Sequence, residues 1–221
     1  MKALYNIIIS SILVIALSGF SFPEPFNVLH KPPKKQVIFH TSLTTEVTEA
    51  SVKPIIAVLK AAPRGSVVYI EINSPGGSVE AGLEVLDAIH TCKGLVVTHV
   101  ADHKMAASMA AIILMDGTVI HADPKALILF HSFGNMAKDK QGHLIFVKIL
   151  PNGHNQPSEI AEMAWARAIL EETCGKVMTR QEIIEATVGG QDEWFTGERV
   201  MYRLKAHYGL LYHPGAHVCT T

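Results

Sequence analysis

Apolar positions follow two different spacings along the chain, and the two spacings alternate. The segments 37–39, 67–72 and 95–100 are rich in β-branched residues and predict strands. Between them, 47–59 and 78–91 carry apolar residues three and four positions apart, which predicts helices. Repeated strand, helix and strand predict an α/β fold with a mostly parallel sheet and covering helices.

The second half of the chain continues this alternation. We expect further elements at 106–115 (a nearly all-apolar helix), 119–121 and 127–130 (strands), 158–174 (a long helix) and 197–207 (a last helix). Thr179 followed by Glu182 is a capping-box pattern and predicts another helix that ends before Gly189. Segment 134–157 predicts a hairpin or loop that protrudes from the core around a short strand at 144–150. Large apolar side chains of the second half are expected to pack inside: Ile160, Met163, Trp165, Leu170 and Trp194.

The first residues have the pattern of an export signal. Lys2 precedes an apolar run at 7–20, and Pro23 and Pro25 follow it. About 14 apolar residues fall short of the roughly 18 to 20 that cross a bilayer, so a cleaved signal peptide is favoured over a permanent anchor. We therefore predict a signal peptide or N-terminal anchor at 1–22, and a periplasmic or secreted protein with inner-membrane anchoring as the alternative. Contact with a membrane is expected only through this segment.

Length and charge narrow the function classes. The chain has 221 residues with 48% hydrophobic residues, which suits one well-filled domain at 36–212 after a Pro/Lys-rich linker at 23–35 and before a tail at 213–221. Its formal net charge of −1 provides no global field for nucleic acid, so no nucleic-acid partner is expected.

Cysteine and histidine patterns give no clear cofactor site. The three cysteines are far apart and have no C-x-x-C spacing, which speaks against a structural zinc site or a thioredoxin motif. One disulfide remains open for an exported chain. A C-terminal group could bind a metal but is irregularly spaced: His207, His213, His217 and Cys219. We expect neither a metal nor another cofactor.

Candidate chemistry lies in three places. Asn-Ser-Pro-Gly-Gly-Ser at 73–78 ends a buried strand where a helix starts, which suits an oxyanion hole or an ordinary strand-to-helix turn. Ser108 begins an apolar helix of small residues, as a nucleophile with open access would, although a small core serine is equally consistent. His131 closes an apolar strand, where an imidazole suits a general base.

Taken together, these segments resemble the Clp protease proteolytic subunit family, whose fold is the ClpP/crotonase spiral of ββα units with a protruding handle region. The resemblance runs from about 37 to 211. It rests on the strand Val-Ile-Phe at 37–39, followed by four motifs in order: Tyr-Ile-Glu-Ile-Asn-Ser-Pro-Gly-Gly-Ser-Val-Glu-Ala-Gly at 69–82, Ala-Ala-Ser-Met at 106–109, Leu-Phe-His-Ser at 129–132 and Gln-Asp-Glu-Trp-Phe-Thr-Gly-Glu at 191–198. This chain departs from the family in having Lys104-Met105 before Ala-Ala-Ser, Ser132-Phe133 after the histidine and a longer handle.

The resemblance implies a serine endopeptidase. By it, Ser108 is the nucleophile, His131 the general base and Asp192 the carboxylate that orients the imidazole. The backbone N–H groups of Gly77 and Met109 would bind the oxyanion. The implied partners are a peptide or unfolded protein as substrate and further copies of the chain in a homo-oligomeric ring. Because an exported enzyme has no ATP for an unfoldase, we expect it to work without one.

Two other functions share these motifs. A Ser-Lys membrane-associated peptidase resembling signal peptide peptidase A also has Asn-Ser-Pro-Gly-Gly, and would need a lysine that reaches Ser108. A non-proteolytic crotonase-fold protein would keep the fold and use the oxyanion hole differently.

Overall fold

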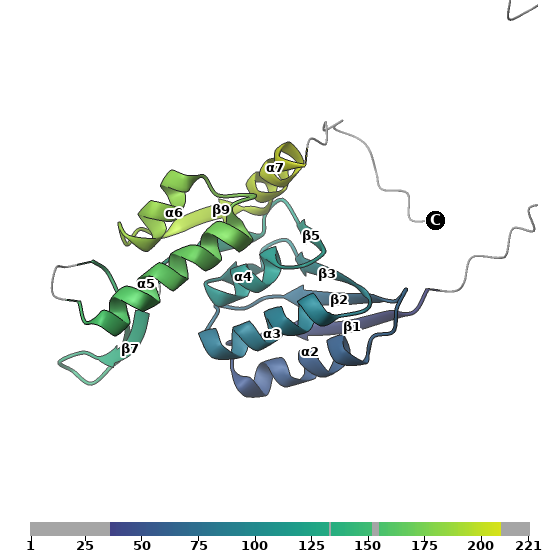
Figure 1. Cartoon of the computed structure of the whole chain (residues 1–221), viewed down its shortest axis with the longest axis horizontal. Helices are drawn as coiled ribbons and strands as arrows, with labels where there is room; N and C mark the ends of the chain where they lie inside the picture. Colours follow the sequence, from purple (N-terminus) through teal and green to yellow (C-terminus); the bar gives the residue numbers. More distant parts are fainter. Residues whose placement is uncertain (1–35, 133, 152–154, 209–221) are drawn as a thin grey trace, which may run out of the picture. The chain divides into compact units, whose positions relative to one another are not determined.

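A four-stranded parallel sheet forms the first half of the fold in the computed structural model, which describes residues 36–132, 134–151 and 155–208 (Figure 1). Its strands lie in the order β1-β2-β3-β5. Their bounds are Ile38–Leu43 for β1, Val67–Ile72 for β2, Leu95–Val100 for β3 and Val119–Ala122 for β5. Each parallel neighbour is reached through a crossover that contains a helix, as parallel pairing requires.

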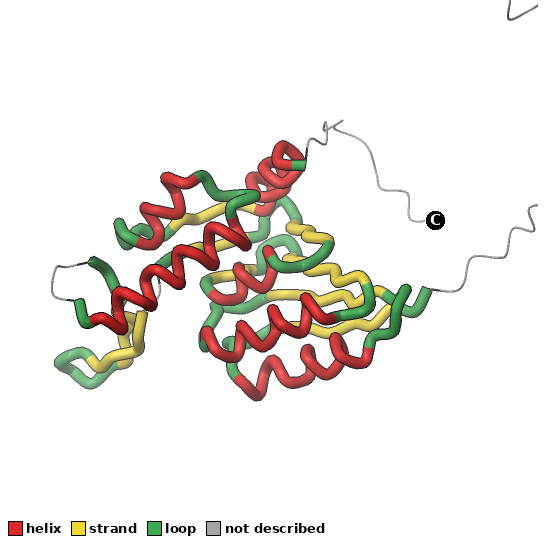
Figure 2. The backbone as a smooth tube through the Cα atoms, in the orientation of Figure 1, coloured by secondary structure: helices red, strands yellow, loops and turns green. Residues whose placement is uncertain are grey.

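Helices α2 (Glu49–Ala61), α3 (Val79–Thr91) and α4 (Met109–Met115) cover one face of this sheet (Figures 1 and 2). The Ser78 side chain accepts a hydrogen bond from the Ala81 N–H and starts α3 directly after the glycine turn. The strand residues that face these helices alternate with exposed ones and are fully buried, as Val68, Ile70 and Val96 are. The main hydrophobic core therefore lies between the sheet and these three helices.

The opposite face of the sheet, here called the open face, carries exposed and half-buried side chains. The strand register aligns them in rows across β1, β2, β3 and β5. The row at the amino end of the strands is apolar, with Ile38 54% and Leu95 41% exposed. The row at the carboxyl end is polar, and in it His99 lies beside His121. Parallel sheets are usually covered on both faces, so this face is unusual for a domain that acts alone.

A smaller sheet, in the order β4-β6-β9, connects the two halves of the fold. Its strands are β4 (Met105–Ala107), β6 (Leu127–Phe130) and β9 (Glu193–Thr196). The expected helix at 106–115 is therefore too long at its start: Ala106 and Ala107 are strand, because they pair with Ile128 and Leu129 of β6. Strand β9, which sequence patterns did not predict, pairs antiparallel with β6.

The remaining elements complete the second half of the fold. They are the hairpin of β7 (Gly134–Lys138) and β8 (Leu144–Lys148), α5 (Pro157–Ile169), the π-helical turn η1 (Leu170–Cys174), α6 (Arg180–Thr187) and α7 (Gly197–His207). The expected hairpin is confirmed, and the long helix at 158–174 ends in a π turn instead of remaining α-helical throughout.

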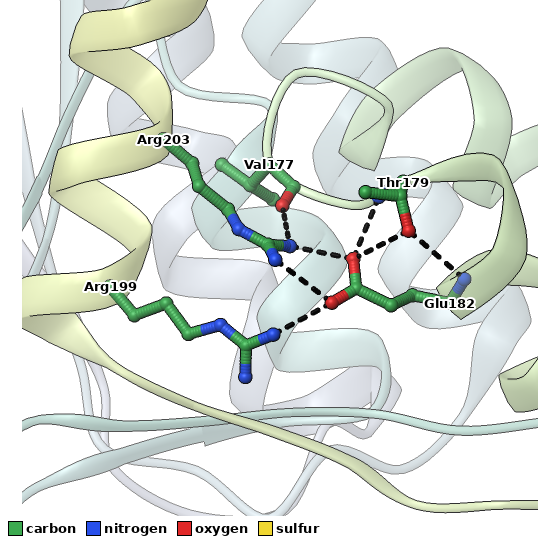
Figure 3. Close-up of polar contacts among 5 residues, drawn as sticks. All are labelled: Val177, Thr179, Glu182, Arg199 and Arg203. Atoms are coloured by element: carbon green, nitrogen blue, oxygen red, sulfur yellow. Dashed lines mark hydrogen bonds and ion pairs between the residues drawn. The ribbon is translucent and has the colours of Figure 1, made fainter.

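A polar clamp ties α6 to α7 (Figure 3). Glu182 accepts hydrogen bonds from Arg203 at 2.6 and 2.9 Å and from Arg199 at 2.7 Å. It also accepts one from the Thr179 N–H at 2.8 Å, which completes the predicted capping box. Arg203 in turn donates to the Val177 carbonyl. These contacts fix the C-terminal helix against the segment that leads into β9.

Several expectations about buried side chains are wrong. Trp194, Ile160 and Trp165 are 48%, 54% and 39% exposed, while Leu170 is buried as expected. Their positions carry large apolar residues, but the local pattern does not specify which face of an element another element covers.

Other expectations lie outside the described residues, namely those on the N-terminal segment, on the tail and on Cys219. In the described part of the chain, no helix is long and apolar enough to span a membrane. Cys92 and Cys174 are both free thiols.

Candidate active site

The turn after β2 is built to bring backbone close to Ser108. Gly76 has φ +94°, a conformation that favours glycine, and the Ser74 hydroxyl accepts a hydrogen bond from the Gly76 N–H at 3.2 Å. A Cβ on Gly76 would lie 2.6 Å from the Ser108 Cβ and 2.5 Å from the Ala107 carbonyl oxygen. Ser74 also pairs with Ala106 through an isolated parallel bridge. The turn therefore lies directly against the residue that sequence analysis singled out as nucleophile.

Ser108 has strained backbone geometry at the junction of β4 and α4. Its φ of 55° and ψ of −127° lie outside the regions that L-residues usually adopt. Its N–H donates to the Leu129 carbonyl at 2.9 Å, and its own carbonyl accepts from Ala111 in α4. Strain of this kind persists only where the surroundings enforce it, and it concentrates at functional sites.

His131 follows β6 directly, and its ring is partly buried. Its Nδ1 lies 2.5 Å from the Ser132 carbonyl oxygen, and its ring meets the edge of Phe146 with centroids 5.1 Å apart. Burial lowers the pKa of His131, and Lys148 acts in the same direction, whereas the Ser132 carbonyl and Asp192 raise it; the net shift is downward. The imidazole is therefore neutral at pH 7, as a general base must be.

Asp192 precedes β9 and is held by a cation. Lys148, at the end of β8, donates to Asp192 Oδ1 at 2.7 Å and to the Gly190 carbonyl at 2.7 Å. The Asp192 side chain is 47% exposed. Among the described residues, no hydrogen bond joins Asp192 to His131 or His131 to Ser108.

One cleft of about 950 Å³ unites these groups. Ser108, His131 and Asp192 all line it, together with the glycine turn and residues of the β7–β8 hairpin. This volume is in the range of substrate pockets, roughly 300 to 1,000 Å³. Three segments that are far apart in the sequence thus reach one concave surface.

The two backbone N–H groups expected to bind an oxyanion are available. Gly77 pairs with Val47 in a parallel bridge, but the hydrogen bonds of that bridge use the Gly76 carbonyl and the Ser78 N–H. Met109 is the first residue of α4, where an N–H has no partner within the helix. Within the described part of the chain, neither N–H donates to a protein group. Both can therefore donate to a ligand.

Sequence analysis missed two residues of this cleft, Lys148 and Phe146. Both belong to β8, two positions apart, and so they share a face of the strand. The sequence at 144–150 predicts a short, mostly apolar strand, but nothing in it indicates which residues the hairpin faces.

Comparison with known proteins identifies the family. The family model described as Clp protease matches residues 25–144. ATP-dependent Clp protease proteolytic subunit 2 of Tropheryma whipplei (strain Twist) is 31% identical over 153 residues, which cover 66% of this chain and 72% of the relative. The chain belongs to the Clp protease family. A second relative, ATP-dependent Clp protease proteolytic subunit 1 of Leifsonia xyli subsp. xyli (strain CTCB07), is 31% identical over 142 residues, 61% of this chain and 62% of the relative.

Membership in the Clp protease family makes the chain a serine-type peptidase, a hydrolase. The predicted α/β class, with a parallel sheet and covering helices, is confirmed and agrees with the fold of the family. The matched segment includes Ser108 and His131 and ends before Asp192. The roles of these three residues, and of Gly77 and Met109, stay predictions.

Proposed function

We propose that the chain is an endopeptidase that cleaves peptide bonds with Ser108 as nucleophile, His131 as general base and Asp192 as orienting carboxylate. The observation that carries this proposal is the cleft, which Ser108, His131 and Asp192 line together. Gly77 lines it too, and neither its N–H group nor that of Met109 donates to a described protein group. The serine peptidase chemistry of the family and the lowered pKa of His131 support it.

The tautomer of His131 follows from its contact with a carbonyl. A carbonyl oxygen only accepts, so Nδ1 carries the proton and donates it to Ser132, which leaves Nε2 with a free lone pair. Nε2 then takes the proton from the Ser108 hydroxyl as the oxygen attacks the peptide carbonyl. The tetrahedral oxyanion is bound by the N–H groups of Gly77 and Met109. The protonated imidazole next gives its proton to the leaving amine, and water hydrolyses the acyl-enzyme by the reverse sequence.

Asp192 takes its role when its carboxylate turns from Lys148 toward the imidazolium that forms during attack. The charge of Asp192 already acts on His131 by raising its pKa. The Lys148 and Asp192 side chains are 24% and 47% exposed, so solvent can replace part of their contact.

A peptide or unfolded segment is the substrate class that suits this cleft. Asn135 and Phe146 of the β7–β8 hairpin line it together with Ile149, which follows β8, so polar and apolar residues share the cleft with Ser108. We propose further that the protein is periplasmic or secreted, or anchored in the inner membrane through its first residues. It would then act without an ATP-driven unfoldase, as a homo-oligomeric ring in which another copy covers the open face.

A Ser-Lys peptidase is the second candidate, because Lys148 lines the same cleft as Ser108. Its ammonium group donates to Asp192 and to the Gly190 carbonyl instead of contacting the Ser108 hydroxyl. This placement of the ammonium group favours the histidine mechanism.

Labelling with a fluorophosphonate tests the proposal directly. We expect the full chain to be labelled at Ser108, and Ser108→Ala and His131→Ala to lose labelling. Asp192→Asn should slow it by orders of magnitude, because the imidazolium loses its orienting charge. Ser78→Ala is the matched control, since Ser78 lines the same cleft but caps α3. It should be labelled like the parent chain.

The variants also separate the two candidates. Brisk labelling of His131→Ala together with loss in Lys148→Met would replace the histidine mechanism with the Ser-Lys mechanism. Undiminished labelling of Ser108→Ala would reject both.

A further inference from the structure

Three side chains at the carboxyl end of the open face converge on one point, away from the catalytic cleft. His99 and His121 are register partners on the neighbouring parallel strands β3 and β5, so their side chains leave the same face. Asp123 is two positions after His121, and its N–H donates to the Val100 carbonyl, which continues the ladder past the end of β5. It therefore projects from the same face as His121.

Two distances among their polar atoms are close to those of a tetrahedral metal site. His99 Nε2 lies 3.3 Å and His121 Nδ1 lies 3.6 Å from Asp123 Oδ1. All three candidate ligand atoms lie within 4.8 Å of one another. Zinc bound at about 2.0 to 2.2 Å by imidazole and carboxylate places tetrahedral ligand atoms about 3.4 Å apart. Small side-chain adjustments would therefore bring all three atoms onto one ion.

Backbone contacts hold the carboxylate in place. Asp123 Oδ2 accepts a hydrogen bond from the Asp102 N–H at 3.2 Å, and this leaves Oδ1 directed at the two imidazoles. Asp102 is fixed in turn, because its Oδ1 accepts from the Lys125 N–H at 2.8 Å. Supporting contacts of this kind orient the ligands of metal sites in general.

The imidazoles are stacked and differ in burial. Their centroids are 5.0 Å apart, and the side chain of His99 is 14% exposed against 55% for His121.

Other histidine–carboxylate contacts in the described chain are pairs only. His90 contacts Asp116 at 3.0 Å, and His143 contacts Asp139 at 3.2 Å. Of the residues that the structure describes, only His99, His121 and Asp123 form a group of three with metal-ligand geometry.

We propose that His99, His121 and Asp123 bind one divalent transition-metal ion of the Zn²⁺ type on the open face. Two imidazoles and a carboxylate are a donor set that suits zinc, and three protein ligands leave a fourth position for water or a group on a binding partner. The site would bridge β3 and β5 at the edge of the fold where a second molecule can approach.

Titration of Zn²⁺ into the tag-free full chain, previously stripped with a chelator, tests this site. We expect one ion per chain by calorimetry, and a tetrahedral d–d absorption spectrum when Co²⁺ replaces Zn²⁺. His121→Gln and Asp123→Asn should each weaken binding about tenfold or more, because each removes one ligand. Both side chains are partly exposed, and asparagine still accepts the Asp102 N–H, so the variants should fold; far-UV circular dichroism checks this.

Two matched controls localise the ion. His90→Gln breaks a histidine–carboxylate pair that has no third ligand, and it should bind Zn²⁺ like the parent chain. The triple variant His207→Gln, His213→Gln, His217→Gln removes the C-terminal histidines and should also leave the affinity unchanged.

Two results would overturn the proposal. One is binding that is equally strong in the His99→Gln, His121→Gln double variant, or absent already from the parent chain. The other is binding that disappears in the C-terminal triple variant.

Discussion

At the residue scale, the pKa of His131 is influenced by two opposite charges, Asp192 and Lys148, which themselves form an ion pair at 2.7 Å. Asp192 raises the pKa of His131, and Lys148 lowers it, in addition to the lowering by burial. Because a base must be deprotonated to act, the acid limb of kcat/KM against pH reports this pKa. We expect the limb to lie below the ordinary histidine value of 6.5.

Two substitutions should move this limb in opposite directions. Lys148→Met removes the cation and should shift the limb to higher pH, whereas Asp192→Asn removes the anion and should shift it to lower pH. Hydrolysis of a fluorogenic peptide measured across the pH range gives both shifts. Equal limbs in the two variants would mean that neither charge acts on the catalytic base.

Gly76 sets the position of the nucleophile, and a methyl group there should disturb it. Gly76→Ala would place a Cβ 2.6 Å from the Ser108 Cβ in a backbone with φ +94°. Gly65→Ala has the same kind of left-handed backbone, with φ +84°, but nothing lies within 4 Å of its Cβ. Each should cost about 1 to 2 kcal/mol of unfolding free energy from the backbone alone.

Only Gly76→Ala should also slow labelling of Ser108, by about 100-fold, since a displacement of about 1 Å at a reacting group has an effect of that size. Labelling rates of the two variants, compared at equal folded fraction, measure the difference. Similar labelling rates in the two variants would mean that Gly76 does not set the position of Ser108.

Local sequence motifs predict several of the residues that line the cleft. The glycine turn, Ser108 and His131 were recognisable because close backbone approach, a small-residue nucleophile segment and a strand-terminal histidine leave local patterns. Lys148 and the metal-type group of His99, His121 and Asp123 were not, because their meeting depends on strand register and hairpin placement. Strand register and hairpin placement cannot be predicted from the spacing of residues along the sequence.

At the element scale, the one capping signal located its helix correctly, whereas tertiary pairing overrode the apolar helix pattern at the start of 106–115. Thr179 and Glu182 gave the start of α6 correctly, since a capping box is a local hydrogen-bond pattern. Ala106 and Ala107 have high helix propensity and are nevertheless strand, because β6 and Ser74 offer them partners on both sides.

The clamp between α6 and α7 should make stability depend on pH. Although burial acts in the opposite direction, the hydrogen bonds from Arg203 and Thr179 hold the pKa of Glu182 at about 2, below its ordinary value of 4.5. A carboxylate with a lowered pKa stabilises the fold above pH 4.5, and this contribution is lost as pH falls toward 2.

Glu182→Gln should therefore lower the unfolding free energy at pH 7 by about 2 kcal/mol and have little effect near pH 2. Glu171→Gln breaks an exposed pair with Arg167 and should cost less than about 0.5 kcal/mol. Urea unfolding of both variants at the two pH values tests the difference. Equal losses in the two variants would contradict the importance of the clamp.

At the scale of the whole molecule, the open face predicts self-association. Its apolar row exposes Ile38 and Leu95, and parallel sheets are rarely left uncovered. Leu95→Asp should shift the full chain toward smaller species in sedimentation velocity, because burial of a carboxylate in an interface is unfavourable. Tyr202→Asp alters a more exposed residue on α7, 70% exposed, and should leave the distribution unchanged. A parent chain that sediments as a monomer would contradict this prediction.

Strand β8 carries both Phe146, which rests on the ring of His131, and Lys148, which holds Asp192. Because these two side chains share one face of one strand, a bound peptide that shifts β8 shifts the Phe146–His131 contact and the Lys148–Asp192 contact together. On the proposed mechanism, peptide binding and the alignment of Asp192 with His131 would therefore be coupled, and part of the binding energy would be used to align these catalytic groups.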